Sequence, residues 1–326
     1  NPDILDFAYH FRQVYQYHDR WYTDFNPGAS STIRLKDSMG SYFFNFIITV
    51  NEFGFRTYDR KLDYTMKGNT KGKIIHAIGD SFTMGWGVNY ETSYPALLEF
   101  NLPYNYRVLN LGLNGYGTIA ATEKSEETAQ HFMPDAVVYL ATENDYDDDE
   151  KAFVHSTKSH IIHALYDALN FLRQHTYIAS TPFALYWWFY YKELIKVKPS
   201  DFPEKKSFHK FVIDNFKILD INTKQNRLMG NHSKSALLKY NSYLEKRDIL
   251  FIVISHGKGP VSRDIHAFCK ANGIDSYLVS VPKSLRLNKE GHFNYLGNYK
   301  FAILVRNILR KKGFIRNDTP KGEAAK

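Results

Sequence analysis

The sequence has little cysteine, no long apolar stretch and no block of basic residues. Its one cysteine, Cys269, excludes a disulfide within the chain and a cluster of cysteine metal ligands. No apolar run reaches about 18 residues, the length that a membrane-spanning helix needs. The net charge is +8, but lysines and arginines are spread along the chain. Without a basic block or a zinc-finger spacing, nucleic acid is not an expected partner.

The remaining composition is that of an aromatic-rich globular protein. With 326 residues, 44% hydrophobic and 23% charged, the chain suffices for one large domain or two ordinary ones. Its 24 Tyr and 24 Phe are expected to pack in a core or to line a substrate groove. The start at Asn1 rather than Met, together with the aromatic N-terminal region, favours an exported or membrane-anchored protein over a cytoplasmic one. Any membrane association would then come from a segment upstream of the chain. The oligomeric state is left open.

From residue 74 onward, apolar runs alternate with helical segments. This alternation is typical of a parallel sheet covered by helices on both faces. The expected strands are Ile74–Ile78, Arg107–Leu111, Ala136–Leu140, Ile249–Ser255 and Ile274–Val281. The expected helices are Ser93–Phe100, Ile119–Phe132, Ser262–Asn272 and a last helix through 301–309. We therefore predict an α/β fold, a three-layer α/β/α sandwich with a flavodoxin-like parallel sheet.

Other segments flank or interrupt this pattern. Residues 1–70 read as an aromatic-rich N-terminal appendage, in which Tyr42–Val50 is expected to be a strand or the arm of a hairpin. The main domain is expected at 71–310, and the charged tail at 311–326. At about 146–248 a helical insertion interrupts the alternation. It is expected either to cover the strand ends as a lid or to pack as a helical excursion.

Polar residues and glycines follow the expected strands. Gly79-Asp80-Ser81 follows the first strand, the loop 112–117 the second, and Glu143-Asn144-Asp145 the third, while Glu290-Gly291-His292 precedes the last helix. The carboxyl ends of parallel strands meet at one edge of a sheet, so these segments are expected to converge. A serine hydroxyl needs a neighbouring base to become a nucleophile, and His292 is the candidate.

In this order the segments resemble the SGNH, or GDSL-type, hydrolase superfamily. The resemblance covers about 74–145 and 249–310, and the stretch 51–56 is similar to a lead-in found in some members. It implies a serine esterase or acyl hydrolase that forms an acyl-enzyme, with Ser81 as the nucleophile, His292 as the base and Glu290 as the acid that orients His292. The backbone N–H groups of Ser81 and Gly115 and the side-chain amide of Asn144 would form the oxyanion hole. Neither a metal nor an organic cofactor is implied.

Two positions depart from the family pattern. The acid expected three residues before His292 falls on Lys289, so Glu290 would have to act at a shorter spacing. If Glu290 does not, a Ser–His pair with a backbone carbonyl behind the ring is the alternative. Two residues before Asn144 the family has glycine, whereas this chain has Thr142, which is expected to narrow that side of the site.

The sequence leaves the substrate and the acceptor open. The ester could be an O-acyl group of a carbohydrate or a lipid, so the expected partner is a small-molecule, glycan or lipid ester. A glycan O-acyltransferase would use the same residues. A non-catalytic binding protein on a hydrolase fold is the third possibility.

Overall fold

The computed structural model describes residues 2–36, 42–58, 72–156, 229–287 and 291–315. The centre of the predicted insertion, the predicted acid Glu290 and the end of the charged tail lie outside these ranges. Within them, every helix is too short or too polar to cross a membrane.

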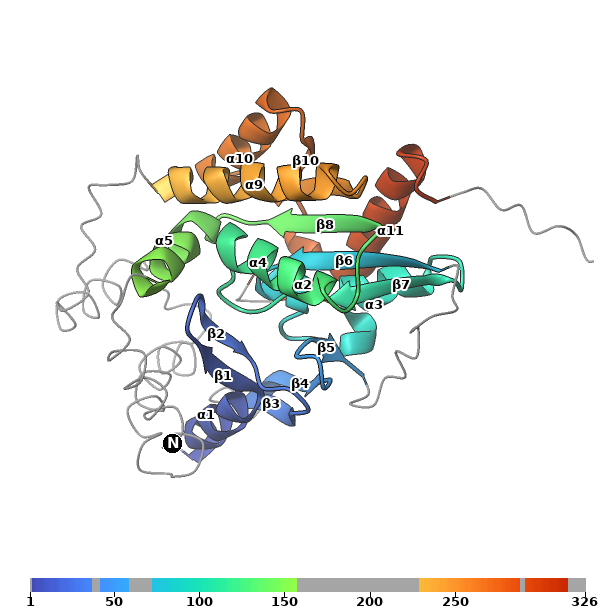
Figure 1. Cartoon of the computed structure of the whole chain (residues 1–326). Coiled ribbons are helices and arrows are strands. Elements are labelled where there is room, and N and C mark those ends of the chain that lie inside the picture. The colour runs from blue at the N-terminus through green and yellow to red at the C-terminus, as the bar shows by residue number, and fades with distance from the viewer. Residues whose placement is uncertain (1, 37–41, 59–71, 157–228, 288–290, 316–326) are drawn as a thin grey trace, which may run out of the picture.

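Five parallel strands form the centre of the molecule (Figure 1). They are β6 (Lys73–Gly79), β7 (Tyr106–Asn110), β8 (Ala136–Ala141), β9 (Leu250–His256) and β10 (Asp275–Val279). Their order across the sheet is β10-β9-β8-β6-β7, which in chain order of these strands is the 2-1-3-4-5 arrangement of flavodoxin-like folds. The predicted sheet is confirmed. Its strands are runs of Val, Ile and Ala because parallel strands are buried on both faces.

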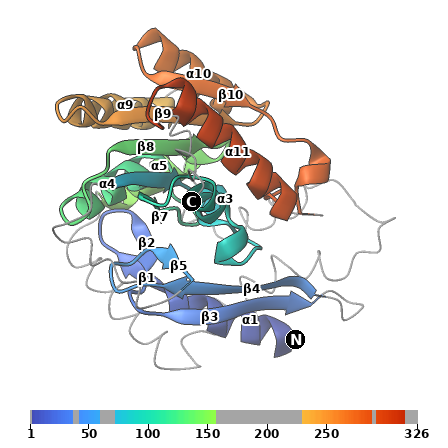
Figure 2. The ribbon, with the colours of Figure 1, turned by 90° about the vertical axis from the view of Figure 1, so that its right-hand side faces the viewer.

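Helices cover both faces of this sheet, as Figure 2 shows edge-on. On one face lie α4 (Thr118–Ala129), α9 (Met229–Glu245) and α10 (Pro260–Ala271), with α5 (Asp145–Ser156) against α4 and α9. On the other face lie α3 (Tyr94–Phe100) and α11 (Tyr295–Lys311). Successive strand residues alternate between the two cores, so Ala77 packs on the α3 and α11 side and Ile78 on the α4 side. The predicted three-layer sandwich is therefore confirmed.

Most predicted elements lie within two residues of the observed ones, and α4 is an exception. The helix predicted to reach Phe132 ends at Ala129. Phe132 instead packs edge-on against Phe55 at a ring distance of 6.0 Å. This contact with the N-terminal segment was not visible in the helical pattern.

The N-terminal segment begins with α1 (Pro2–Val14) and a separate ribbon of β1 (Tyr15–His18) and β2 (Tyr22–Phe25). Its next strands are β3 (Ser30–Lys36), β4 (Tyr42–Val50) and β5 (Arg56–Thr57). These three extend the central sheet as antiparallel strands, joined to β7 through the pair Arg56 and Asn110 (Figure 1). The segment predicted as an appendage thus shares its sheet with the main unit, while the predicted domain boundaries stay a prediction.

Candidate active site

The carboxyl end of β6 is the switch point of the parallel sheet. From β6 the chain passes to β7 on one side and later to β8 on the other. In open sheets of this kind, ligands bind in the crevice outside the strand ends at such a point. Ser81 lies two residues after the last residue of β6 and is therefore at this point.

A short helical turn, α2 (Ser81–Met84), presents Ser81. The Asp80 carboxylate caps it by accepting a hydrogen bond from the Phe82 N–H at 2.9 Å. Gly85 ends the turn in a left-handed conformation that glycine adopts without steric cost. Ser81 remains partly exposed, which the predicted role of a nucleophile requires.

The structure brings Ser81 and His292 together although they lie 211 residues apart. The Nε2 atom of His292 lies 2.8 Å from the Ser81 Oγ. The His292 carbonyl accepts a hydrogen bond from the Leu287 N–H at 2.7 Å, and the ring packs against Phe82 at 4.7 Å between ring centroids. Just beyond it, Asn294 caps α11 by accepting from the Gly297 N–H. The segment after β10 is thus held so that the imidazole reaches the serine.

The loop after β7 packs closely against the Ser81 turn. A β-carbon on Gly112 would lie 2.4 Å from the Met84 nitrogen, so only glycine allows this approach. The Leu113 N–H donates to the Gly79 carbonyl at 3.2 Å. Gly115 has a φ of 79°, and a β-carbon at this position would meet no atom within 4 Å, so its backbone is open. No backbone carbonyl among the described residues accepts from the N–H of Gly115 or of Ser81.

The segment after β8 holds Asn144 by both ends of its amide. Its Nδ2 donates to Asp148 Oδ2 at 2.6 Å, and its Oδ1 lies 2.8 Å from the hydroxyl of Thr142. Asn144 itself is exposed, whereas Thr142 and Asp148 are buried. The predicted oxyanion donors therefore lie on loops at the same sheet edge as Ser81. Their catalytic roles stay predictions.

Two buried carboxyls lie under this edge. Burial raises the pKa of Asp80 to about 6, against the opposing effect of its hydrogen bonds from Phe82 and Thr142. Burial and the nearby Asp80 charge raise the pKa of Asp145 well above its usual range. Asp145 also contacts the Tyr139 hydroxyl. Carboxyls with raised pKa values can hold a proton near neutral pH, so each of these two groups can be neutral or charged in the folded protein.

Arg56 is a site residue to which the sequence pattern assigned no role. Its side chain is fully buried, and its guanidinium donates to the carbonyls of Met84, Gly85 and Val88 at 2.7 Å each and of Ile47 at 2.9 Å. The first two carbonyls end the α2 turn. A cation there also matches the negative end of the turn's dipole. Arg56 therefore fixes the turn that carries Ser81 from outside the parallel sheet.

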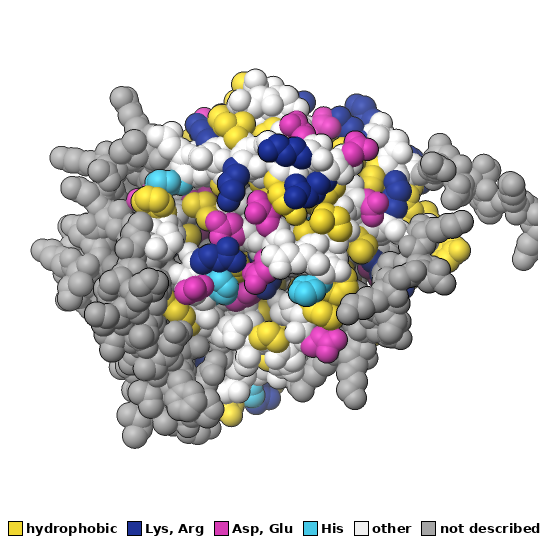
Figure 3. All heavy atoms as spheres, in the orientation of Figure 1, with side chains coloured by type: hydrophobic (Ala, Val, Ile, Leu, Met, Phe, Trp, Pro, Cys, Tyr) yellow, Lys and Arg dark blue, Asp and Glu magenta, His cyan; other side chains and the backbone are white. Residues whose placement is uncertain are grey.

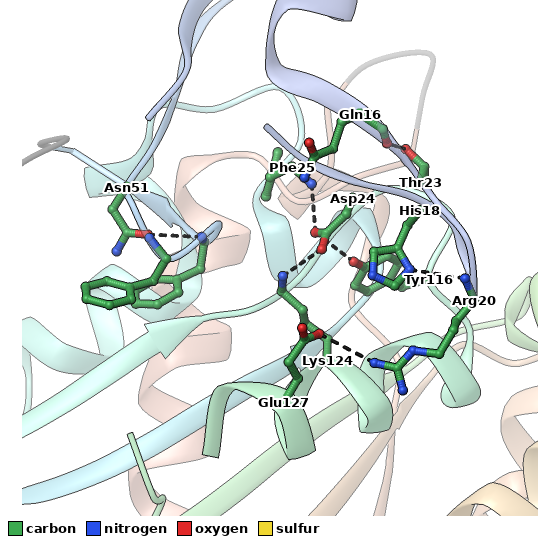
Figure 4. Close-up of polar contacts among 12 residues, drawn as sticks. Gln16, His18, Arg20, Thr23, Asp24, Phe25, Asn51, Tyr116, Lys124 and Glu127 are labelled. Atoms are coloured by element: carbon green, nitrogen blue, oxygen red, sulfur yellow. Dashed lines mark hydrogen bonds and ion pairs between the residues drawn. The ribbon is translucent and has the colours of Figure 1, made fainter. Parts of the chain in front are cut away.

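The β1–β2 ribbon supports the neighbouring glycine loop (Figure 4). Asp24 of β2 forms a buried ion pair with Lys124 of α4, with an N–O distance of 2.7 Å. The same carboxylate accepts from the Tyr116 hydroxyl at 3.0 Å. Tyr116 follows Gly115 directly and is almost fully buried. The ribbon thereby holds the loop that carries a predicted oxyanion donor.

The face over α4 and α9 carries mixed charge (Figure 3). A groove there is lined partly by Arg20, Glu123, Glu126 and Lys239, and none of its lining residues belongs to the Ser81 site. Interspersed charges of both signs do not favour a polyanion. Among the described residues, no group of three or more His, Cys, Asp or Glu side chains is placed to hold a metal ion.

No protein-family model matches the chain, and no curated protein matches its sequence. Solved structures do match. A GDSL-like lipase from Bacteroides thetaiotaomicron is 15% identical, with 74% of this chain and 89% of that chain covered and a TM-score of 0.36. The M. smegmatis aryl esterase is 13% identical, with 74% and 99% covered and a TM-score of 0.36.

AlinE4, an SGNH-hydrolase family esterase, is 15% identical to this chain. The match covers 75% of this chain and 98% of AlinE4, with a TM-score of 0.37.

Proposed function

We propose that the protein is a serine esterase or acyl hydrolase that works through an acyl-enzyme. The observation that carries this proposal is the 2.8 Å contact between Ser81 Oγ and His292 Nε2 at the switch point of the sheet. A serine within hydrogen-bond reach of an imidazole is the arrangement that nucleophilic catalysis requires. The glycine loop and Asn144 at the same edge are suited to an oxyanion.

In the proposed reaction, Ser81 Oγ attacks the ester carbonyl carbon while His292 Nε2 takes the serine proton. The carbonyl oxygen becomes an oxyanion, which the N–H groups of Ser81, Gly115 and Asn144 stabilise. The C–O bond to the alcohol then breaks, and His292 returns the proton to the leaving oxygen. Water, deprotonated by His292, attacks the acyl-enzyme in the same way and releases the acid. Glu290 would orient the His292 ring.

The ester is proposed to be an O-acyl group of a carbohydrate or a lipid. The test is turnover of a short-chain p-nitrophenyl ester by the parent chain, Ser81→Ala and His292→Ala. We expect each variant to lose at least about a thousandfold in kcat because the two residues act as a unit. Ser242→Ala, a change at an exposed serine of α9, is the control and should retain activity.

A serine-directed fluorophosphonate should label Ser81 in the parent chain. Absence of both labelling and turnover would favour a binding protein on a hydrolase fold and would refute the proposal. If a sugar acceptor diverts the acyl group from water, the same site works as a glycan O-acyltransferase.

A further inference from the structure

Thr142 lies between two parts of the candidate site. It follows β8 directly, and its side chain is almost fully buried, with an exposed fraction of 2%. The family pattern has a glycine here, which could make no side-chain contact. The hydroxyl of Thr142 is therefore a feature of this chain that needs its own explanation.

The hydroxyl bridges the nucleophile turn and the oxyanion amide. Its oxygen lies 2.8 Å from Asp80 Oδ2, 2.8 Å from Asn144 Oδ1 and 2.9 Å from Asp145 Oδ1. Asp80 caps the turn that begins at Ser81. One side chain thus contacts both the cap of the nucleophile and the amide that is proposed to bind the oxyanion.

The three contacts of the Thr142 hydroxyl require a particular arrangement of protons. A hydroxyl donates one proton and accepts through two lone pairs. It can donate to only one of the three oxygens, so the other two partners must donate to Thr142 in return. Asp80 and Asp145 are the partners able to do so, since each is a buried carboxyl with a raised pKa. With the protons of both carboxyls directed at Thr142, the threonine proton is available for Asn144 Oδ1, and the raised pKa values of Asp80 and Asp145 favour this arrangement.

The Asn144 amide is then held at both ends. Thr142 holds the oxygen, and the Asp148 carboxylate, which is paired with Lys151 at 2.7 Å, holds one N–H of the nitrogen. The amide group is planar, so fixing these two atoms fixes the direction of the second N–H. That N–H is the one available for a substrate oxyanion.

We propose that Thr142 is a positioning residue, whose hydroxyl holds the Asn144 amide in the orientation that presents its second N–H to the oxyanion. This inference rests on the proposed function, in which Asn144 is an oxyanion donor. The competing explanation is that Thr142 only fills space under the loop. The positioning role requires the hydroxyl of Thr142, whereas the space-filling role requires only the volume of its side chain.

The test compares Thr142→Val, which keeps the shape but loses the hydroxyl, with Thr142→Ser, which keeps the hydroxyl. For p-nitrophenyl ester turnover we expect the valine variant to lose about tenfold to a hundredfold in kcat, part of the loss that follows removal of a whole oxyanion donor. KM should change less than about twofold, since the interaction is made in the transition state. The serine variant should retain kcat within about threefold.

A double mutant separates positioning from packing. Because Thr142 acts through Asn144, the variant Thr142→Val with Asn144→Ala should be no slower than Asn144→Ala alone. Thr122→Val is the matched control. Its hydroxyl is also buried and donates to the Thr118 carbonyl at 2.8 Å, but on α4 and away from Ser81, so kcat should be unchanged.

The outcomes are distinguishable. If the parent is labelled by fluorophosphonate and turns over ester, but Thr142→Val keeps full kcat or its effect adds to that of Asn144→Ala, the role of Thr142 is refuted alone. If the parent is neither labelled nor active, the proposed function fails, and this inference with it. If the valine variant does not fold, Thr142→Cys replaces it, because a thiol is a weak hydrogen-bonding group of similar size, and the same loss of kcat is expected.

Discussion

At the scale of single residues, Arg56 holds the segment around Ser81 through several hydrogen bonds to backbone carbonyls. Lysine at this position would keep the charge but lose the planar fork that reaches several carbonyls. We expect Arg56→Lys to lower the free energy of unfolding by about 1–3 kcal/mol, because buried carbonyls lose their donors. It should also lower kcat, since two of those carbonyls end the Ser81 turn. Urea unfolding and ester turnover measure the two effects.

The control for Arg56 is Arg247→Lys, at an exposed arginine beyond α9 that donates to the Tyr243 carbonyl. It should change neither quantity appreciably. Equal stability of the Arg56 and Arg247 variants would contradict the assigned role.

The residues of the site differ in how far the sequence revealed them. Ser81, His292 and Asn144 stand in segments with a recognisable order, and the structure brings the first two into contact. Arg56 could not be predicted, because its partners are backbone carbonyls, which carry no sequence signal. Thr142 was visible as a departure, but its hydrogen bonds depend on how three loops converge. Glu290 stays a prediction.

At the scale of elements, the β1–β2 ribbon depends on the ion pair between Asp24 and Lys124. Asp24→Asn leaves a buried ammonium without its counter-charge, which costs about 3–5 kcal/mol. Adding Lys124→Met should recover part of this loss, because the lone charge disappears. Asp19→Asn, at a side chain 73% exposed in the same ribbon region, is the control and should be near neutral. Chemical unfolding of the four chains checks this prediction.

Elements with strong periodicity were predicted well, and their connections were not. The parallel strands are short runs of Ile, Val and Ala that few other structures accommodate. By contrast, β5 has two residues and pairs with β7 at one position. Such a strand has no pattern to detect, so the joining of β3, β4 and β5 to the central sheet was missed.

At the scale of the whole molecule, buried titratable groups make the stability of the fold depend on pH, and two of them act in opposite directions. Burial raises the pKa of Asp149 to about 7 from its ordinary value of 3.8. Between these values the folded state keeps a proton that the unfolded state has released, so stability falls as pH rises and the cost is complete above pH 7. Burial lowers the pKa of His76 to about 3. That group contributes stability that is lost as pH falls from 6.5 toward 3.

Asp149→Asn isolates the first of these effects. Asparagine can still accept from the Ile119 N–H and hydrogen-bond Ser233, but it cannot ionise. At pH 8 we expect the variant to be more stable than the parent by about 2–4 kcal/mol, and near pH 4 to differ little. Asp147→Asn, at an exposed position of the same helix, should follow the parent. Parallel stability curves for Asp149→Asn and the parent would contradict this account.

The buried guanidinium of Arg56 also has a consequence for truncation of the chain. A chain beginning at residue 72 would retain Ser81, His292 and the whole parallel sheet. It would lose the donor to the carbonyls of Met84, Gly85 and Val88. We therefore expect the parallel sheet not to be modular at its N-terminal side, and gene fusions or shuffled libraries that cut between β5 and β6 to yield a sheet in which the turn that carries Ser81 lacks its Arg56 support.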